Sequence, residues 1–277
     1  MTDKYAVIGN PISQSKSPLI HTTFARQTGQ DLDYTSIAGQ LGGFRDNAER
    51  FRKEGGRGLN VTTPFKLDAF EYVTDLHEQA RLAGAVNALK FEGERIYGQN
   101  FDGIGVVRDI VCNLETPMQG KRVLLLGAGG AVRGAMLPIL QQQPDRLLLV
   151  NRMESKAQIL FEQFETYATG DFSYGSYSDL SVMQERFDLV INGTSATLHG
   201  EVLPIPAGVF TNSLLAYDMA YGKGLTPFLK LAQESGAKRI ADGVGMLVEQ
   251  AAEAFAWWRG IRPGTKAMIE TLAVPLT

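Results

Sequence analysis

The hydrophobic positions of this chain fall into two patterns that follow one another repeatedly. Short uninterrupted apolar runs are typical of strands buried on both faces, and longer segments with apolar residues three or four positions apart are typical of helices. The clearest run is Val123–Leu126, which leads into a glycine turn and a predicted helix over 131–142. Because strands and helices alternate, the sequence predicts an α/β fold with a doubly wound parallel sheet.

The same patterns predict the remaining elements. Strands are expected over residues 5–8, 32–37, 58–62, 85–91, 95–98, 146–150, 172–174, 187–192, 214–219 and 238–240. Helices are expected over residues 18–28, 43–54, 104–114, 155–164, 226–235 and 265–273, and from Pro64 and Asp242 onward. Ser17 is expected at the N-cap of the first helix, with Pro18 at the first helical position. The long helix after Asp242 has a predicted core stripe of Leu247, Ala251, Ala254 or Phe255, and Trp258.

The glycine turn Gly127-Ala-Gly-Gly-Ala131 predicts a nucleotide site. A strand, a glycine turn and a helix N-terminus direct several free backbone N–H groups at one point, where the helix dipole also favours a phosphate. Gly127 permits the tight turn, and Gly129 permits a close approach of the backbone to a pyrophosphate. The third position of the usual fingerprint is Val132, so the match is incomplete, and an ordinary glycine-rich turn is the alternative.

The residues after the next predicted strand indicate which nicotinamide cofactor fits. NAD-binding chains usually carry an Asp or Glu there, which accepts a hydrogen bond from the adenine ribose. This chain has Asn151-Arg152 instead, with Lys156 one helical turn further on. Two cations at a strand end suit a 2′-phosphate, and the alternative is a pair of solvated basic residues. The sequence therefore predicts NADP(H).

Composition and charge narrow the classes of partner. With 277 residues the chain is long enough for two domains, and a net charge of −3 without a basic stripe argues against nucleic acid. No apolar run approaches the roughly 20 residues of a membrane helix, so no membrane partner is expected. No signal peptide precedes the first strand, and the single cysteine, Cys112, fits a reducing cytoplasm. We expect a cytoplasmic monomer or homodimer with a small-molecule substrate and no metal.

Three predicted helix starts in the N-terminal part carry polar or charged side chains. Ser15 and Ser17 place two hydroxyls beside free N–H groups, which makes an anion site sized for a carboxylate, unless Ser17 is only a cap. Lys66 falls in a first helical turn, where the dipole disfavours a cation, so it is a surface lysine or a functional one. Asp102 precedes another helix as a cap or as an acid. None of the three histidines adjoins another candidate acid or base, so a Lys–Asp pair is the better available catalyst.

A series of polar and glycine-containing motifs runs along the chain. The first are Gly9-Asn-Pro-Ile-Ser-Gln-Ser-Lys-Ser-Pro18 with His21, Asn60-Val-Thr-Thr-Pro-Phe-Lys66, Gly84-Ala-Val-Asn87 and Asn100-Phe-Asp-Gly-Ile-Gly105. The later ones are Gly127-Ala-Gly-Gly-Ala131, Asn151-Arg152, Ile191-Asn-Gly-Thr194, Asp218-Met-Ala-Tyr221 and Asp242-Gly-Val-Gly-Met-Leu247 with Gln250. A chain with these motifs in this order resembles the shikimate dehydrogenase family, from Tyr5 to the final helices.

The resemblance implies a fold and a reaction. An α/β substrate domain (1–103, completed by 242–277) and an NADP-binding, Rossmann-like domain (104–241) would flank a cleft. The reaction would be the reversible NADPH-dependent reduction of 3-dehydroshikimate to shikimate, in aromatic amino-acid (chorismate) biosynthesis. Chemically this is consistent, because a lysine can donate a proton to the carbonyl oxygen while the cofactor supplies the hydride.

The resemblance also implies roles for individual residues. Lys66 and Asp102 would be the catalytic pair. Ser15 and Ser17 would bind the substrate carboxylate. The ring hydroxyls would be bound by Thr62, Asn87, Asp102, Tyr221 and Gln250. The cofactor would be bound by Gly127, Ala128, Gly129, Gly130, Ala131, Asn151, Arg152, Lys156, Thr194, Met219, Gly243 and Met246.

The sequence departs from the family pattern at four positions. Ala88 and Phe101 stand where the family usually has threonine, beside a substrate asparagine and the catalytic aspartate, and this affects substrate selectivity. Met153 replaces a threonine and Lys156 a common arginine, and both changes weaken the 2′-phosphate site.

Three other functions fit parts of the pattern. A quinate/shikimate dehydrogenase of the same family would oxidise either acid, perhaps with NAD. Methylenetetrahydrofolate dehydrogenases have a similar fold with a lysine active site, but the Ser15/Ser17 motif argues against them. A non-catalytic NADP(H)-binding sensor would not need both Lys66 and Asp102.

Overall fold

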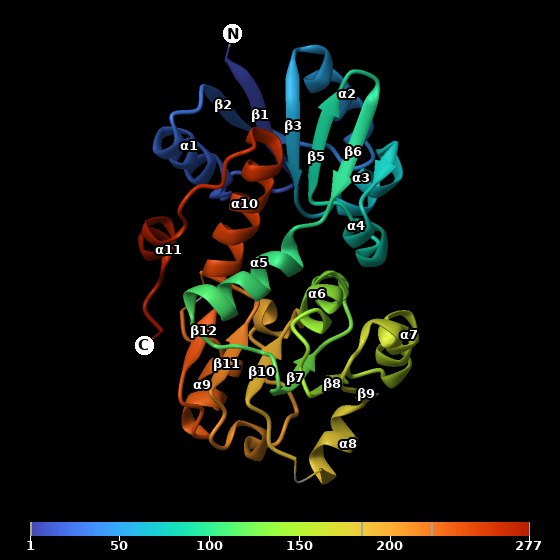
Figure 1. The fold of residues 1–277 in the computed structure, drawn as a ribbon, viewed down its shortest axis with the longest axis vertical. Helices are drawn as coiled ribbons and strands as arrows, with labels where there is room; N and C mark the ends of the chain where they lie inside the picture. The colour runs from blue at the N-terminus through green and yellow to red at the C-terminus, as the bar shows by residue number, and fades with distance from the viewer. Residues whose placement is uncertain (1, 184, 223, 277) are drawn as a thin grey trace. The chain divides into compact units, whose positions relative to one another are not determined.

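The computed structural model describes residues 2–183, 185–222 and 224–276, and its strands form two separate six-stranded sheets. The first unit comprises Met1–Gly105 and Val248–Met268, and the second comprises Val106–Leu247 and Ile269–Thr277 (Figure 1). This division places residues 242–247 and 269–277 in the second unit, whereas the family pattern assigned them to the first.

The first sheet is mixed. Its order is β2-β1-β3-β5-β6-β4. The strands are β1 (Asp3–Gly9), β2 (Leu32–Ala38), β3 (Gly56–Val61), β4 (Asp75–Leu76), β5 (Ala88–Glu92) and β6 (Arg95–Gln99). Strand β1 is parallel to both β2 and β3, while β5 is antiparallel to both β3 and β6. An antiparallel hairpin is therefore inserted between the parallel part of the sheet and β4.

Strand β1 shows why this unit has two cores. Successive side chains of a strand point to opposite faces of the sheet. Ala6 and Ile8 pack into one cluster with residues of α2 (Phe44–Lys53) and α3 (Lys66–Tyr72). Tyr5 and Val7 pack into the other, with residues of α10 (Val244–Arg259). Because both faces are covered, residues 5–8 of the strand are all apolar rather than alternating with polar residues.

The second sheet is parallel throughout, in the order β12-β11-β10-β7-β8-β9. Its strands are β7 (Arg122–Leu126), β8 (Arg146–Val150), β9 (Asp171–Gly175), β10 (Leu189–Asn192), β11 (Leu215–Asp218) and β12 (Ile240–Asp242). The chain begins in the centre at β7, winds outward through β8 and β9, then returns to the other side of β7. This is the doubly wound, Rossmann-like arrangement that the sequence predicted.

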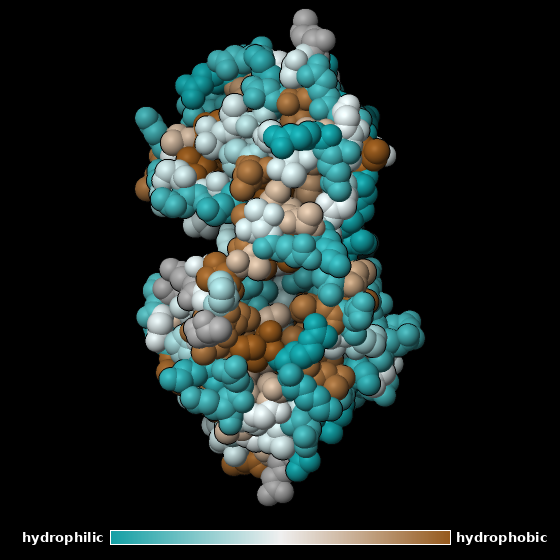
Figure 2. Space-filling model, turned by 90° about the vertical axis from the view of Figure 1, so that its left-hand side faces the viewer, coloured by the Kyte–Doolittle hydropathy of each residue, from teal (hydrophilic) through white to brown (hydrophobic). Residues whose placement is uncertain are grey.

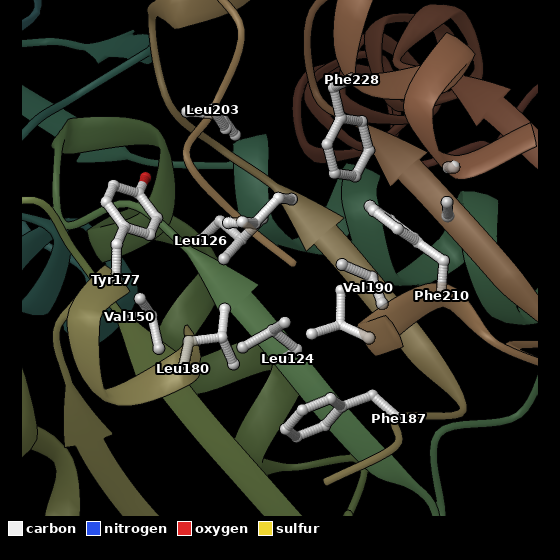
Figure 3. Packing of buried hydrophobic residues seen from close by; sticks show 14 of the residues in the cluster. Leu124, Leu126, Val150, Tyr177, Leu180, Phe187, Val190, Leu203, Phe210 and Phe228 are labelled. Carbon is white, nitrogen blue, oxygen red and sulfur yellow. The ribbon is translucent and has the colours of Figure 1, made fainter. Parts of the chain in front are cut away.

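One core of the second unit lies on one face of this sheet (Figure 3). Leu124 and Leu126 of β7 meet Val150 and Val190 from the neighbouring strands there. The aromatic side chains around them come from four later segments: Tyr177, Phe187, Phe210 and Phe228. Each fully buried side chain of this size contributes roughly 1.5–3 kcal/mol.

Most of the remaining helices connect these strands, and α11 follows the last strand and α10. The remaining helices are α1 (Ser17–Thr28), α4 (Glu78–Ala83), α5 (Asp102–Arg108), α6 (Gly130–Leu140), α7 (Glu154–Phe164), α8 (Tyr177–Val182), α9 (Pro227–Glu234) and α11 (Lys266–Leu272). A π-helical turn, Asp109–Asn113, extends α5, and short 3₁₀ turns cover Glu165–Tyr167, Ala196–His199 and Ala207–Phe210.

Several local predictions were wrong. Ser17 is the first residue of α1 and Lys16 precedes it, so Ser17 does not cap the helix. The helix expected over 104–114 begins at Asp102, which is helical rather than a cap, and continues as a π turn from Asp109. Leu247 is only half-buried, and Val248 is buried instead. The sequence analysis also missed β4, α4 and α8, which are short elements.

The surface carries hydrophobic residues in scattered positions. On the face drawn in Figure 2, hydrophobic residues lie among hydrophilic ones in both units. Exposed large side chains such as Leu41, Leu67 and Val182 come from separate segments. Within the ranges that the structure describes, no helix has both the length and the apolar character needed to cross a bilayer.

Gly58 of β3 allows a tether between α10 and the first sheet. The Trp258 indole donates a hydrogen bond to the Leu89 carbonyl oxygen at 2.9 Å. A Cβ atom on Gly58 would lie 2.6 Å from Trp258 Nε1 and 2.7 Å from that oxygen. We expect Gly58→Ala to lower the free energy of unfolding by about 1–3 kcal/mol, the usual cost of overpacking a core.

Urea unfolding followed by far-UV circular dichroism checks this expectation. Gly208→Ala is the control, because a Cβ atom there would meet nothing within 4 Å, and its effect should stay within about 0.5 kcal/mol. Equal stability of the two variants would contradict the overpacking argument.

Candidate functional site

The strand directions of the first sheet gather its polar candidates at one edge. Because β5 is antiparallel to both β3 and β6, the latter two run in the same direction, and so does β1. Ser15 and Ser17 follow β1, Lys66 follows β3, Asp102 follows β6, and Asn87 immediately precedes β5. The carboxyl ends of three strands and the amino end of a fourth therefore lie along the same edge.

At this edge Lys66, Asp102 and Asn87 form a hydrogen-bonded cluster. The Lys66 ammonium donates to Asp102 Oδ2 at 2.6 Å, and Asn87 Nδ2 donates to Asp102 Oδ1 at 2.8 Å. Both oxygens of the carboxylate are thus held. The side chains of Lys66 and Asp102 remain 32% and 15% exposed, so a small molecule can reach the pair. A cation at the first position of α3 is disfavoured by the helix dipole, and Asp102 compensates that cost.

Backbone contacts fix the Asp102 carboxylate in position. The Asn87 side-chain oxygen accepts a hydrogen bond from the Phe101 N–H at 2.9 Å, which also orients the amide nitrogen toward Asp102. The Asn100 side-chain oxygen accepts from the Asp102 N–H at 3.1 Å, and its nitrogen donates to the Ala85 carbonyl at 3.1 Å. Asn87 and Asn100 are buried, so these amides are structural supports rather than solvated groups.

The serine pair is joined to a buried polar cluster. The Ser17 N–H donates to Ser15 Oγ at 3.3 Å, so Ser15 partly takes the capping role expected of Ser17. Burial raises the pKa of Tyr34 well above its usual range, and the Ser17 hydroxyl partly offsets this. The Tyr34 hydroxyl donates to Asn60 Oδ1 at 2.6 Å. Ser17 therefore lies beside a fixed phenol.

His21, one helical turn after Ser17, is buried against this cluster. Its ring stacks on Tyr34 with centroids 4.3 Å apart, and neither ring nitrogen makes a hydrogen bond of normal geometry among the described residues. Burial lowers the pKa of His21 to about 3, against a smaller opposing effect of the Asn60 side chain. The ring is neutral at physiological pH, so it does not supply the acid or base of this site.

For three further substrate candidates the structure gives fewer contacts. Thr62 follows β3, and its Cγ2 methyl lies against Gly9, where an added Cβ would be 2.5 Å away. Gln250 lies in the part of α10 that belongs to the first unit. Tyr221 belongs to the second unit, and its side chain is exposed.

The glycine turn of the second unit has the geometry that a diphosphate requires. Gly127 follows β7 with a φ of 108°, a conformation that favours glycine. Gly129 and Gly130 are exposed, and an added Cβ on either would meet nothing within 4 Å. Helix α6 begins at Gly130, so the N–H groups of its first turn, including that of Ala131, point toward this open space. Ala128 completes the turn.

This turn lies at the switch point of the second sheet. The chain leaves β7 on one side toward β8 and returns on the other side at β10, and ligands of such folds bind where the order reverses. Thr194, after β10, contacts the turn: an added Cβ on Gly127 would lie 3.1 Å from its methyl group. The Thr194 N–H and hydroxyl donate to Asn192 Oδ1 at 3.0 and 2.8 Å.

A buried carboxylate holds the loop after β10. Asp218 is fully buried at the end of β11. It accepts hydrogen bonds from the Thr197 and Thr226 hydroxyls, each at 2.8 Å, and from Asn192 Nδ2 at 3.1 Å. The Ala220 N–H supplies a fourth donor at 3.2 Å. Burial raises the pKa of Asp218, and these donors oppose that effect by favouring the charged form.

Cations follow β8, as the sequence predicted. Arg152 and Lys156 are both exposed, and Asn151 Nδ2 donates to the Met153 carbonyl oxygen at 2.9 Å. Arg152 Nη2 lies 3.2 Å from Glu201 Oε2. A 2′-phosphate would find a bidentate partner in the Arg152 guanidinium and a point charge in Lys156. Together with the open glycine turn, this donor set fits NADP.

The last cofactor candidates lie after β11 and β12. The Met219 sulfur lies near Gly193, where an added Cβ would be 3.0 Å from it. Gly243 donates its N–H to the Ala220 carbonyl oxygen at 3.0 Å, and an added Cβ there would be 2.3 Å from the Met219 oxygen. Met246 follows in the first turn of α10. Close backbone packing therefore requires glycine at position 243.

Some residues of the two sites were not identified by the sequence analysis. Asn100 and Asp218 were part of recognised motifs, yet their supporting roles appear only from their contacts. Glu201 carries no motif at all, because a loop brings it to Arg152 from 49 positions along the chain. Only three-dimensional proximity identifies such a partner.

Comparisons with known proteins extend over the whole chain. Residues 7–89 match the shikimate dehydrogenase substrate binding domain, residues 110–200 match shikimate / quinate 5-dehydrogenase, and residues 243–273 match the shikimate 5′-dehydrogenase C-terminal domain. The shikimate dehydrogenase (NADP(+)) of Chromobacterium violaceum is 53% identical over 272 residues, covering 98% of each chain.

Solved structures agree with the fold. An Ael1 enzyme from Pseudomonas putida matches with a TM-score of 0.96 and 54% identity, covering 100% of both chains. The shikimate 5-dehydrogenase of Thermus thermophilus, in complex with NADP(H) and shikimate, matches with a TM-score of 0.85 and 26% identity, covering 98% of both chains.

The buried His21 makes stability depend on pH. Its folded pKa of about 3 lies below the ordinary value near 6.5, so the unfolded chain binds more protons between these pH values and stability falls as pH falls through them. From pH 7 to 4.5 this one group should remove about 2–3 kcal/mol from the free energy of unfolding.

Urea unfolding of wild type and His21→Phe at pH 7 and pH 4.5 measures this contribution. Phenylalanine keeps the stacked ring but does not titrate, so its stability should fall less over this range. His199→Gln, at an exposed position, should behave as the wild type does. An unchanged pH dependence in His21→Phe would show that burial does not lower the pKa of His21 in the folded protein.

Proposed function

Because the chain belongs to the shikimate dehydrogenase family, we propose that it catalyses the reversible NADPH-dependent reduction of 3-dehydroshikimate to shikimate. The reaction is a step of aromatic amino-acid biosynthesis. The Lys66–Asp102 contact of 2.6 Å, at an edge that a small molecule can reach, is the observation that carries the proposal. We place the enzyme in the cytoplasm as a monomer or homodimer that needs no metal, nucleic acid or membrane.

The reaction needs a hydride and a proton. NADPH, when bound, supplies the hydride to the carbonyl carbon of the substrate. Lys66 donates the proton to the carbonyl oxygen as negative charge develops there, and in the oxidation it takes the proton of the hydroxyl back. Asp102 holds the lysine nitrogen in place and accepts a hydrogen bond from a ring hydroxyl, while Asn87 fixes the carboxylate.

The other polar residues bind and orient the substrate. Ser15 and Ser17 hold its carboxylate, with two hydroxyls and the N–H groups of the first turn of α1. Thr62, Asn87, Tyr221 and Gln250 bind the ring hydroxyls. Hydrogen bonds to a charged carboxylate are worth more than those to neutral groups, so the serines carry much of the affinity.

The cofactor occupies the second unit. The turn at Gly127, Ala128, Gly129, Gly130 and Ala131 binds the diphosphate with backbone N–H groups. Arg152 and Lys156 bind the 2′-phosphate, and Asn151 supports their loop. The part of the cofactor site next to the switch point is formed by residues that follow β10, β11 and β12: Thr194, Met219, Gly243 and Met246.

The two departures near the substrate residues do not alter this set. Ala88 and Phe101 are buried in the hydrophobic cluster that contains Trp258, and the Phe101 ring lies 5.7 Å from the Trp257 ring. Their side chains pack in the core, so neither provides a group to the substrate. Oxidation of quinate as well as shikimate, with either cofactor, is the second candidate function, and assays with both acids and both oxidised cofactors distinguish the two.

Lys66→Ala tests the proposed acid/base. We expect kcat to fall by roughly 10²–10⁴-fold, the usual effect of losing such a group. Binding of NADP⁺ should be retained, because the residues proposed to bind its phosphates belong to the second unit, and Lys66 belongs to the first. Lys90→Ala is the matched control, since the Lys90 ammonium pairs with Glu92 at 2.6 Å and belongs to neither proposed site. Turnover of Lys66→Ala at the wild-type rate would refute the assignment.

Ser15→Ala and Ser17→Ala test the carboxylate site. Each should raise KM for shikimate roughly tenfold to a hundredfold, because a hydrogen bond to a charged group is lost. The KM for NADP⁺ should not change. Ser13→Ala, at an exposed neighbouring position, controls for disturbance of the loop. If shikimate methyl ester is turned over as fast as the acid, the carboxylate is not recognised by these serines.

Arg152→Ala tests the choice of cofactor. The KM for NADP⁺ should rise strongly and that for NAD⁺ little, because NAD⁺ has no phosphate for the guanidinium. Lys156→Ala should have the same effect but a smaller one. Both effects should shrink at high salt, since these side chains are exposed. Equal kinetics of the wild type with NADP⁺ and NAD⁺ would instead favour the quinate/shikimate function.

A further inference from the structure

Arg152 already has an anionic partner in the chain. Its Nη2 atom lies 3.2 Å from Glu201 Oε2, and the two side chains are 72% and 51% exposed. Tyr177 lies near enough for the Arg152 charge to lower its pKa, against a larger rise due to burial. The guanidinium therefore contacts the Glu201 carboxylate, its charge acts on the Tyr177 hydroxyl, and most of it remains open to solvent.

The backbone holds Glu201 in this place. The Glu201 N–H donates to the Ala196 carbonyl oxygen at 3.0 Å, after a turn that ends at Gly200 with a φ of 69°. Two residues later, Leu203 is buried in the core of the second unit (Figure 3). An anchor on each side fixes the position of the residue. The backbone of the loop thus keeps the Glu201 carboxylate next to Arg152, although the side chain itself is exposed.

A 2′-phosphate would bind the same Arg152 guanidinium that Glu201 contacts. A phosphate bound to Arg152 by two parallel N–H···O hydrogen bonds uses the same guanidinium N–H groups that a carboxylate would use. It also carries more than one negative charge near the carboxylate of Glu201. Breaking the existing ion pair and bringing two anions together both disfavour NADP(H), and neither affects NAD(H), which lacks the phosphate.

We propose that Glu201 is a specificity-determining residue that competes with the 2′-phosphate for Arg152 and so limits the preference for NADP(H) over NAD(H). This inference rests on the proposed function, because NADP must bind at Arg152 for the competition to occur.

Glu201→Gln removes the charge and keeps the size of the side chain. We expect the Kd of NADP⁺ to fall roughly threefold to tenfold, as for the loss of an exposed ion pair and a screened repulsion. The Kd of NAD⁺ should stay within about twofold, and the gain for NADP⁺ should shrink at high salt. Isothermal titration calorimetry measures both constants without turnover.

Two further variants separate the ion pair from a general change of charge. Glu154→Gln removes another exposed acid, two residues from Arg152, and should alter the Kd of NADP⁺ less than Glu201→Gln does. In an Arg152→Ala background, Glu201→Gln should have only the effect that Glu154→Gln has, because no guanidinium is left to compete for.

The outcomes distinguish this inference from the proposed function. If the wild type oxidises shikimate and Glu201→Gln leaves the Kd of NADP⁺ unchanged, the competition does not exist. The same follows if both cofactors bind more tightly, or if the gain persists in full without Arg152. A wild type that neither binds NADP⁺ nor oxidises shikimate would overturn the proposed function, and this inference with it.

Discussion

The contact between the Lys66 ammonium and the Asp102 carboxylate constrains the whole first unit. The two residues are separated by 36 positions, and they meet only because β3 and β6 end at the same edge of the sheet. The strand between them, β5, runs in the opposite direction, and Asn87, whose amide holds the second carboxylate oxygen, immediately precedes it. The antiparallel hairpin in an otherwise parallel sheet is thus what brings the proposed catalytic pair together.

The second unit gathers its candidate residues at one edge of a sheet that is parallel throughout. All strands run in the same direction and end at the same edge. Gly127, Arg152 and Thr194 therefore lie at that edge, because they follow the neighbouring strands β7, β8 and β10. The turn needs open backbone N–H groups, which rules out side chains that would fill it. The loop after β10 needs a fixed position, and the buried Asp218 provides it through Asn192. A cofactor cradle therefore depends on buried polar groups as much as on glycines.

Sequence patterns predicted most of the elements, since buried strands and amphipathic helices have distinct periods. The central strands of the second sheet were the most predictable, because β7, β8 and β10 are mostly continuous apolar runs, whereas β9 (Asp171–Gly175) is largely polar. Short elements such as β4 were missed, since a strand of two residues has no period to detect. Ser17 was assigned as a cap because serine before proline is a strong helix start, yet the helix begins one residue earlier and Ser17 lies beside Tyr34.

Three carboxylates of this chain lie in distinct environments, and each environment suits a different task. Asp218 is fully buried and satisfied by four donors, so it can organise a loop but cannot take part in exchange with a ligand. Asp102 is partly exposed with both oxygens held, so it is oriented and still accessible. Glu201 is exposed with a single contact, so it can be displaced. The degree of burial limits which of these tasks a carboxylate can perform. A buried carboxylate that loses a hydrogen-bond partner incurs a large desolvation free energy, whereas an exposed one is solvated by water and incurs little. An exposed loop is therefore the place for a carboxylate that competes with a ligand, as we propose for Glu201, because a core carboxylate could not change partners at so small a cost.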